Sequence, residues 1–356
     1  MQMSNKDLGS SFYELKPNDP AYKILTQYPV KLNMAFTVYY SGRNAFMAVF
    51  KDIANKTTIN KIWLPSYYCD TVVNLINRNF NNVHYYNINP FHFNNDLHVT
   101  EFATDNDVVV INNFWGLSSF KNYSSQTNKP VIIEDHTHGW LSEECINSKA
   151  DYCISSLRKM YPIPLGAVAW KPNAKDVLLP YKNTNDLYIL EAHNALLTSM
   201  QLKRQYLKHL KDTKKKYLTL LKKGESLLDL SNSYIKPDDA LIKQINSYYN
   251  YDPNPIKNRN FKLALNGLEA SKNFKVINRK GFTPFGLLLL FKDKEMFNSF
   301  KSWLISNQIY PAHLWPNTCT EAVWKYLLNL HIDYRYDKED ISYLVEKINI
   351  WVKNNV

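Results

Sequence analysis

Two apolar stretches of the sequence lead into side chains that could do chemistry together. Residues 131–136 (VIIEDH) carry Asp135 at the end of an apolar run, and residues 152–157 (YCISSL) are followed by Lys159. Lysine is seldom buried without a partner or a task, so a lysine that closes an apolar strand is a candidate for catalysis. A carboxylate in such surroundings needs a cation or hydrogen-bond donors to stay ionised. The alternatives are a surface lysine and an aspartate that caps a helix.

Two further features could complete a ligand site. Residues 38–46 (VYYSGRNAF) place Ser41 and Gly42 just before a helical pattern, and the backbone N–H groups at a helix N-terminus can bind a phosphate. Residues 65–69 (PSYYC) close another apolar run with two adjacent tyrosines, which could stack on a planar ligand. An ordinary helix cap and a pair of core aromatics are the structural alternatives.

One cofactor, pyridoxal 5′-phosphate (PLP), requires all four features. It needs an amine that binds its aldehyde, an acid that keeps its ring nitrogen protonated, a cup for its phosphate and an aromatic platform for its ring. Lys159 could supply the amine, Asp135 the acid, and the small-residue turn before the helix the cup. The sequence therefore predicts a PLP site.

The elements that must position these residues indicate a mostly parallel sheet. Several apolar runs are continuous rather than alternating, which is typical of strands that are buried on both faces. The expected strands are residues 61–67, 83–88, 108–114, 131–136, 152–157 and 166–170. Helical patterns such as residues 69–79 supply the crossovers of an α/β domain. Ligands bind at the carboxyl ends of such strands, so Asn112, Asp135 and Ser156 should share one rim.

We expect a second, smaller domain in the C-terminal part of the chain. A long helical stretch covers about residues 186–223, and the pattern beyond it mixes helices with a strongly apolar strand. The expected helices are residues 238–249, 255–271, 294–307 and 338–353, and the expected strand is residues 285–291. Residues 1–230 are thus predicted to form a large α/β domain, and residues 231–356 a small α+β domain.

The composition indicates an ordinary globular protein with a basic surface. Of the 356 residues 45% are apolar, and no run of 18 uncharged apolar residues predicts a membrane span. The N-terminus lacks the apolar segment of a signal peptide, and the four scattered cysteines form no CxxC pair, so we expect a reduced protein in the cytosol. Much of the net charge of +11 lies in residues 203–223, whose helical spacing favours a solvated helix face over a nucleic-acid site.

Six segments of the chain resemble motifs of the fold-type I PLP enzymes, and within them of the DegT/DnrJ/EryC1/StrS sugar aminotransferase family. The segments are YYSGRNAF (39–46), IWLPSYYCDTVVNLI (62–76), VVVINNFWG (108–116), VIIEDHTHGW (131–140), SSLRKMYPIPLG (155–166) and NLHIDYRYDKEDISYLVEKI (329–348). The last of them resembles an atypical branch of the family. Lys159 lies 24 residues after Asp135, and the order and spacing of these two motifs are the most specific part of the resemblance. The resemblance implies an aspartate aminotransferase-like fold.

The resemblance also implies a role for each matching residue. Lys159 would bind the cofactor covalently and move a proton during catalysis, Asp135 would pair with the pyridine nitrogen, and His138 would lie near the phenolic oxygen or the substrate. The residues implied to hold the phosphate are Ser41, Gly42, Arg43 and Ser156. Tyr68 would stack on the ring, and Tyr67 is the alternative for that role.

The activity that the resemblance implies is PLP-dependent amino transfer to a keto sugar, with an amino acid such as glutamate as the donor, and we expect the sugar to be linked to a nucleotide. The positive net charge favours an anionic sugar, and the resemblance implies a homodimer. His313, Trp315 and Arg335 are the residues that we expect on the substrate side, although an arginine beside two tyrosines is often structural. We expect neither a nucleic acid nor a membrane as a partner.

Three alternatives stay open at this point. PLP also supports decarboxylation, elimination and acyl transfer, so the enzyme could act in another way on a small amine or amino acid. A non-catalytic PLP-binding relative is a second alternative, although such a relative would normally lack the lysine or the aspartate. A metal site formed by Asp135, His136 and His138 is the third, but alternation along a strand would turn His136 away from Asp135.

Overall fold

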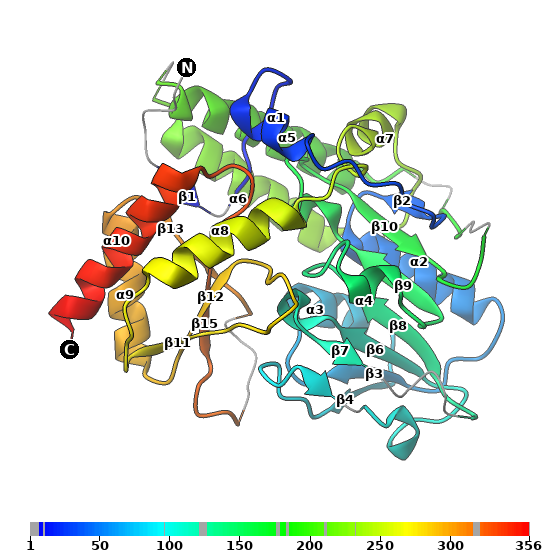
Figure 1. Cartoon of the computed structure of the whole chain (residues 1–356). Helices are drawn as coiled ribbons and strands as arrows, with labels where there is room; N and C mark the ends of the chain where they lie inside the picture. The colour runs from blue at the N-terminus through cyan, green and yellow to red at the C-terminus, as the bar shows by residue number, and fades with distance from the viewer. Residues whose placement is uncertain are drawn as a thin grey trace.

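The computed structural model describes residues 7–9, 11–95, 97–120, 127–175, 179–182, 185–209, 212–231, 233–315 and 321–355. A seven-stranded sheet and a four-stranded sheet, each covered by helices, make up the molecule (Figure 1). None of the described helices combines the length and the apolar character that a membrane span needs.

The large sheet has the strand order β2-β10-β9-β8-β6-β3-β4. Its strands are β2 (Thr37–Tyr39), β3 (Ile62–Pro65), β4 (Val83–Tyr86), β6 (Val108–Asn112), β8 (Val131–Asp135), β9 (Tyr152–Ser155) and β10 (Ala167–Trp170). All neighbours pair in parallel except β10, which is antiparallel to both β9 and β2. The carboxyl ends of β3, β6, β8 and β9 therefore lie along one edge, where ligands bind in α/β sheets.

Both faces of the large sheet are buried, because successive side chains of each strand enter different cores. In β6, Val109 and Ile111 belong to one core, whereas Val108 and Val110 belong to the other. Helices α2 (Gly42–Ala54) and α3 (Asp70–Asn79) cover the second of these faces. The first face is covered by α1 (Pro20–Leu25), α4 (Glu143–Ile146), α5 (Leu187–Leu207) and α7 (Asp239–Asn246). Burial on both faces explains why the strands are continuously apolar.

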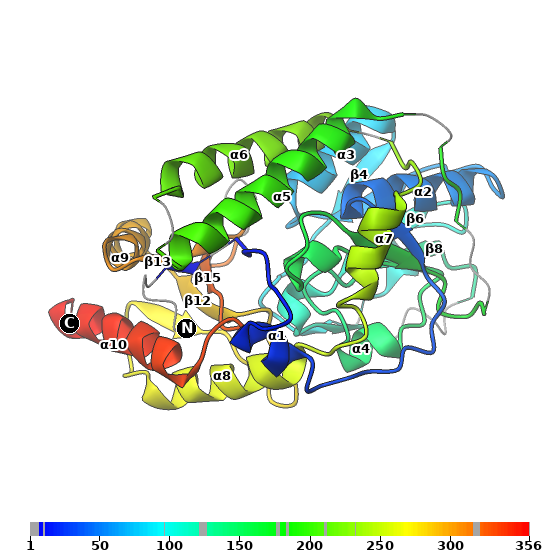
Figure 2. The same ribbon diagram turned by 90° about the horizontal axis from the view of Figure 1, so that it is seen from above.

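Helices α5 and α6 (Lys214–Leu230) pack side by side along one side of the molecule (Figure 2). A Cβ atom added at Gly224 of α6 would come within 2.5 Å of the Leu196 side chain of α5, so the absence of a side chain there permits the close approach of the two helices. This pair fixes one wall of the cavities that are described below.

The small sheet is antiparallel and has the order β11-β12-β15-β14. Its strands are β11 (Phe274–Val276), β12 (Leu287–Phe291), β14 (Ala312–His313) and β15 (Tyr326–Leu330). Helices α8 (Asn254–Gly267), α9 (Lys294–Ser306) and α10 (Lys338–Asn354) share a core with this sheet. The short pairs β1 (Leu8–Gly9) with β13 (Ile309–Tyr310) and β5 (Asn94–Asn95) with β7 (Ser119–Phe120) complete the strands, and single 3-10 turns lie at Val99–Glu101, Phe114–Gly116 and Leu157–Lys159.

Most of the predicted elements correspond to described ones, and the differences are as follows. The stretch expected as one helix over residues 186–223 contains two helices, α5 and α6. The strands β2, β11, β14 and β15 and the short helices α1 and α4 were not among the expected elements. Helix α7 falls in the C-terminal segment expected as the small domain, but its Leu241 and Ile245 pack in the core of the large sheet. A division of the chain near residue 230 therefore stays a proposal.

Candidate active site

A cavity of about 450 Å³ lies where the carboxyl ends of β6, β8 and β9 meet the N-termini of α2 and α3. Residues from both sheets line it. From the large sheet and its helices come Ser41, Gly42, Arg43, Cys69, Asn112, Asp135, Thr137, His138, Ser156, Arg158, Lys159, Glu225 and Asp229, and from the small sheet and its loops come Phe285, Ala312, His313, Leu314 and Trp315. The structure thus brings the predicted lysine, the predicted acid and the predicted phosphate residues to one cavity.

Asp135 is the last residue of β8, and two hydrogen bonds hold its carboxylate. Tyr68 Oη donates to Oδ2 at 2.6 Å, and the backbone N–H of Thr137 donates to Oδ1 at 2.9 Å. Burial, together with the charge of Asp135, raises the pKa of Tyr68 well above its ordinary value, so the hydroxyl keeps its proton and stays a donor. Asp135 is therefore a fixed acid that is aimed at the cavity.

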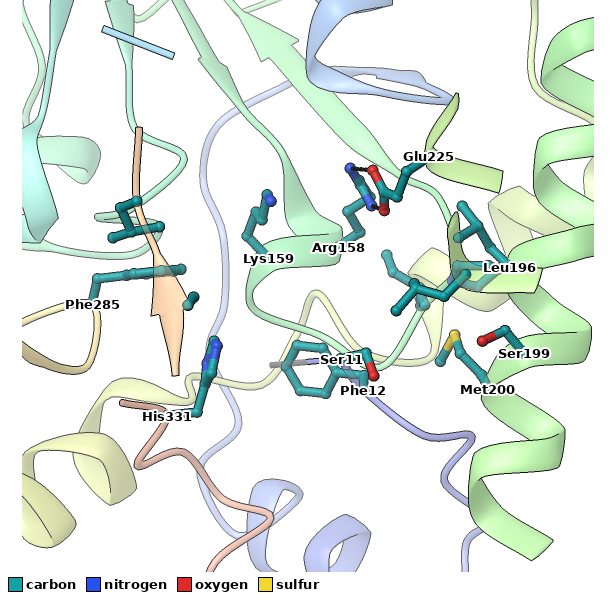
Figure 3. A pocket seen from close by; sticks show the side chains of 15 residues that line it. Ser11, Phe12, Arg158, Lys159, Leu196, Ser199, Met200, Glu225, Phe285 and His331 are labelled. Atoms are coloured by element: carbon teal, nitrogen blue, oxygen red, sulfur yellow. Dashed lines mark hydrogen bonds and ion pairs between the residues drawn. The ribbon is translucent and has the colours of Figure 1, made fainter. Parts of the chain in front are cut away.

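Lys159 ends the 3-10 turn that follows β9, and its side chain lines the cavity. The side chain is accessible to solvent through the cavity, but protein atoms lie close around it. Loss of solvation lowers the pKa of its amine below the ordinary value of a lysine, and the nearby charge of Arg158 lowers the pKa further. Arg158 itself forms a two-pronged ion pair with Glu225 of α6, at 2.6 and 2.9 Å (Figure 3). The amine can therefore lose its proton more readily than that of a surface lysine.

The predicted phosphate residues lie together at one end of the cavity. Ser41 caps helix α2, and a Cβ atom at Gly42 would lie 3.4 Å from the Ser156 side chain. The backbone N–H of Ser156 donates to Thr137 Oγ1 at 3.1 Å, which fixes this part of the rim. The Arg43 guanidinium pairs with Asp229 of α6. The helix N-terminus and the two serines form a cradle for an anion, with an arginine beside it.

Two buried polar atoms of residues that line the cavity have no hydrogen-bond partner in the described part of the chain. They are His138 Nδ1 and Asn112 Nδ2. His138 packs against the rings of both Trp115 and Trp315, each with its centroid 5.4 Å from the imidazole centroid. Burial, with the charges of Lys159 and Lys257, lowers the pKa of His138 to about 3, so the ring is neutral. Because buried polar groups are normally paired, these atoms indicate a polar ligand.

Three predicted site residues do not line this cavity. The Tyr68 ring is fully buried and its hydroxyl is bound to Asp135, and Tyr67 packs among Phe91, Phe114 and Trp315. Neither tyrosine is among the residues that line the cavity, so a stacking role for either of them stays a prediction. Arg335 was expected on the substrate side, but its guanidinium is committed elsewhere.

Arg335 is a structural residue of the interior. It donates to both carboxylate oxygens of Asp333, at 2.8 and 2.7 Å, and to the backbone oxygen of Ser11 at 2.8 Å. Its guanidinium also lies 4.0 Å from the centroid of the Phe12 ring. With these contacts made, Arg335 holds the N-terminal segment against the C-terminal one. The other two residues expected on the substrate side, His313 and Trp315, do line the cavity.

The structure adds residues that the sequence patterns did not single out. Cys69, the residue after the two tyrosines, occupies the N-cap position of helix α3 and lines the cavity. Arg158 is the neighbour of Lys159 in the sequence, and proximity to the lysine was the only available signal. Glu225 and Asp229 lie one turn apart on α6, far from the other motifs in the sequence, so no local signal marked them.

The metal alternative loses its ligand set. His136 turns to the face opposite Asp135, as the alternation along β8 predicted, and its Nε2 lies 2.9 Å from Glu134 Oε2. Cys153 lies close to both, which makes Glu134, His136 and Cys153 a buried group of possible metal ligands in the described residues. Ser148 already bridges this group, because its hydroxyl donates to Glu134 and accepts from the Cys153 thiol. The group is a closed hydrogen-bond network that has no part in the cavity.

Comparison with known proteins gives a match in structure only. No protein-family model matches the chain, and no curated protein does. The PLP form of Spr1654 from Streptococcus pneumoniae matches with a TM-score of 0.63 at 10% identity, over 98% of this chain and 100% of that chain. PseC from Helicobacter pylori, an aminotransferase involved in the biosynthesis of pseudoaminic acid, matches with a TM-score of 0.60 at 11% identity, over 98% and 100%.

A third match is the sugar aminotransferase CalS13 from Micromonospora echinospora, with a TM-score of 0.59 at 11% identity, over 96% of this chain and 99% of that chain. The chain has the fold of these aminotransferases. The predicted aspartate aminotransferase-like fold is thereby confirmed, with its mostly parallel large sheet and its small antiparallel sheet. In this fold the cavity of Lys159 and Asp135 lies at the ligand-binding edge of the large sheet.

Proposed function

We propose that the chain is a PLP-dependent aminotransferase of the DegT/DnrJ/EryC1/StrS family that transfers an amino group to the carbonyl carbon of a sugar. One observation supports this proposal above all others. Lys159, Asp135 and the unpartnered Nδ1 of His138 line a single cavity, in a fold that the chain shares with named sugar aminotransferases. An amine and an acid from separate strands would then reach the two ends of one ring.

The residues of the cavity fit the chemical groups of PLP. Ser156 and the N-terminus of α2 offer hydrogen-bond donors to a phosphate, and the absence of a side chain at Gly42 keeps the space beside Ser156 open. His138 and Asn112 each present a nitrogen that has no partner among the described residues, and such a nitrogen could form a hydrogen bond with the phenolic oxygen of the cofactor. Asp135 offers a fixed carboxylate to a protonated ring nitrogen. When bound, PLP supplies an electron sink for the bonds around the reacting carbon.

The side chains of the cavity then have separate tasks. Lys159 would hold the cofactor and, once released, would take a proton from one carbon and return it to another, a task that the lowered pKa of its amine favours. Asp135 would keep the ring nitrogen protonated, and Tyr68 would hold the carboxylate in position. Neutral His138 would orient the ring by a hydrogen bond rather than by charge.

The sugar, the donor and the assembly are further parts of this proposal. An anionic sugar, such as one linked to a nucleotide, agrees with the net charge of +11, and His313 and Trp315 are placed to contact it. Glutamate is the proposed amino donor. We also propose a homodimer, because active sites of the family that the chain resembles usually lie between two subunits, and a cytosolic location.

The test of cofactor binding uses the full chain with added PLP. The mixture should gain an absorbance band of a protein-bound cofactor, and borohydride reduction followed by peptide mass spectrometry should place the adduct on Lys159. Lys159→Ala should abolish the adduct, whereas Lys236→Ala, a change at an exposed lysine outside the cavity, should leave it intact. A protein that stays colourless with PLP, or an adduct on another lysine, would refute the proposal.

The test of reaction type follows the amino donor. Adding glutamate to the PLP-loaded protein should bleach the band and release 2-oxoglutarate in equal amount, and a nucleotide-linked keto sugar should restore the band. Loss of carbon dioxide or of ammonia instead would favour the decarboxylase or lyase alternative. A band that no amino donor and no ketone changes would favour a non-catalytic PLP-binding protein.

A further inference from the structure

A second, smaller cavity of about 240 Å³ opens beside Lys159, and we call it the side cavity. It shares Arg158, Lys159, Glu225, Phe285, Ala312 and Leu314 with the main cavity, so the two cavities are adjacent and Lys159 borders both. Beyond that shared part, its wall consists largely of Phe12, Ile163, Pro164, Leu196, Met200 and Leu221. Figure 3 shows Leu196 and Met200 projecting from α5 on one side of Lys159, with Phe12 and His331 below.

Apart from the Lys159 amine, the polar groups on the wall of the side cavity are neutral or already paired. Arg158 is bound to Glu225, and the Ser199 hydroxyl donates to the backbone oxygen of Tyr217 at 2.8 Å. Burial, together with the charge of Arg335, lowers the pKa of His331 to about 3, so this ring is uncharged. Once Lys159 holds the cofactor, a charged group that entered the side cavity would lose its water and find no free counter-charge among the described residues of the wall.

The wall is also held firmly in place. Lys203 Nζ donates to the backbone oxygen of Ser11 at 2.9 Å, and Arg335 donates to the same oxygen at 2.8 Å. These bonds fix the N-terminal segment that carries Phe12. Leu196 packs tightly against Gly224 of α6 on the opposite side. The side cavity is therefore preformed, and pre-formed apolar space next to a reacting group is typical of a substrate pocket.

We propose that the side cavity receives a hydrocarbon group of the substrate, so that the keto sugar handled at Lys159 carries an alkyl or aromatic substituent close to the reacting carbon. This inference rests on the proposed PLP chemistry. The size agrees with it, because an apolar cavity of ~150 Å³ in another protein binds benzene. The main cavity, with its polar wall, would hold the cofactor and the remainder of the substrate.

The test compares unbranched primary amines of increasing length on the PLP-loaded full chain. Ethylamine, propylamine, butylamine and hexylamine differ only in methylene count, and their binding is followed by the change of the cofactor's absorbance. Three additional methylenes that leave water completely would tighten binding by up to roughly 50-fold. We expect hexylamine to bind at least ~10-fold more tightly than propylamine.

Two variants of α6 locate the effect. Leu221→Trp fills the side cavity and should reduce the affinity for hexylamine at least ~10-fold while leaving that for ethylamine within about twofold. Leu218→Trp, at a residue on the same helix whose side chain is 45% exposed, is the matched control and should leave the whole series unchanged.

The outcomes separate the two proposals. A coloured, Lys159-linked protein whose affinity does not vary with chain length overturns the side-cavity proposal and leaves the PLP function standing. A length dependence that Leu221→Trp and Leu218→Trp reduce equally also overturns it. A protein that binds no PLP overturns the proposed function, and the side-cavity proposal with it.

Discussion

The Arg335 cluster and the Lys159 cavity are both buried and polar, but they treat their polar atoms in opposite ways. In the cluster, the Arg335 guanidinium donates to Asp333 and to the backbone of the N-terminal segment. In the cavity, His138 Nδ1 and Asn112 Nδ2 have no partner among the described residues. Since folding selects against unpaired buried polar atoms, the cavity tolerates a cost that the cluster avoids.

This difference separates residues that hold the fold from residues that await a ligand. Arg335 and Lys159 are both basic side chains with protein atoms close around them, so the type of residue and its surroundings alone would not separate them. The completeness of the hydrogen bonding distinguishes them. Removal of a residue from the cluster should therefore lower stability, and removal of a residue from the cavity should lower activity.

The largest expected effect is on turnover. Lys159→Arg keeps a positive charge at the cavity but replaces the amine by a group that does not lose its proton in proteins, so the proton transfer and the covalent link are both lost. We expect transamination of glutamate to fall by at least ~10²–10⁴-fold, while the free energy of unfolding of the cofactor-free protein stays within ~0.5 kcal/mol. Steady-state assays and urea unfolding measure the two. Turnover close to wild type would remove Lys159 from the mechanism.

The reverse pattern is expected at Arg335. Arg335→Met leaves the Asp333 carboxylate buried without its partner, which should lower the free energy of unfolding by about 3–5 kcal/mol. The double variant Arg335→Met, Asp333→Leu removes both charges and should recover much of that loss. Any protein that remains folded should still form the PLP adduct. An Arg335→Met variant of normal stability that fails to bind substrate would return Arg335 to the site.

A smaller effect separates the two regions at a single atom. Asn112→Ala removes a side-chain nitrogen that has no partner in the described chain, so stability should change by less than ~0.5 kcal/mol. PLP affinity should fall about tenfold, the equivalent of one hydrogen bond to a charged ligand. Equilibrium dialysis of PLP and urea unfolding measure the two. Unfolding at markedly lower urea with unchanged PLP affinity would place Asn112 with the structural residues.

The strands that carry the site could be predicted because burial on both faces leaves a continuous apolar run. The run expected over residues 131–136 is β8, which ends at Asp135, and the alternation of side chains correctly turned His136 away. Strand β2 has only three residues, Thr37–Tyr39, too few for a period to be recognised. The helical spacing of apolar residues continues across the break between α5 and α6, so the sequence predicted one long helical stretch and no break.

The direction of a side chain in a turn was harder to predict. Strand β3 ends at Pro65, and beyond it no period says which of Tyr67, Tyr68 and Cys69 points into the cavity. The structure places Cys69 there and turns the Tyr68 hydroxyl to Asp135. Contacts between distant segments, such as that between Arg158 and Glu225, depend on the packing of α6 and leave no local trace in the sequence.

The smallest expected effect is a pH shift that the Arg158–Glu225 pair imposes on Lys159. Burial and, after it, the charge of Arg158 lower the pKa of the Lys159 amine, whereas the charge of Glu225 raises it. Burial would raise the pKa of Glu225, but the charge of Arg158 holds it at about 2, so Glu225 is ionised at neutral pH. Only the neutral amine attacks the PLP aldehyde, so the rate of adduct formation should rise with pH and level off above the Lys159 pKa.

Two neutral substitutions should move this profile in opposite directions. Glu225→Gln removes the charge that favours the protonated amine, so the rise should shift to lower pH, and Arg158→Gln should shift it to higher pH, each by up to about one unit. Stopped-flow absorbance of PLP capture between pH 6 and 10 would measure both, with added salt to screen the more distant charges. Shifts in the same direction would mean that the pair acts on the shape of the cavity and not on the charge of the amine. The Arg158–Glu225 pair would then be a structural ion pair like that of Arg335 and Asp333, although it lies beside Lys159.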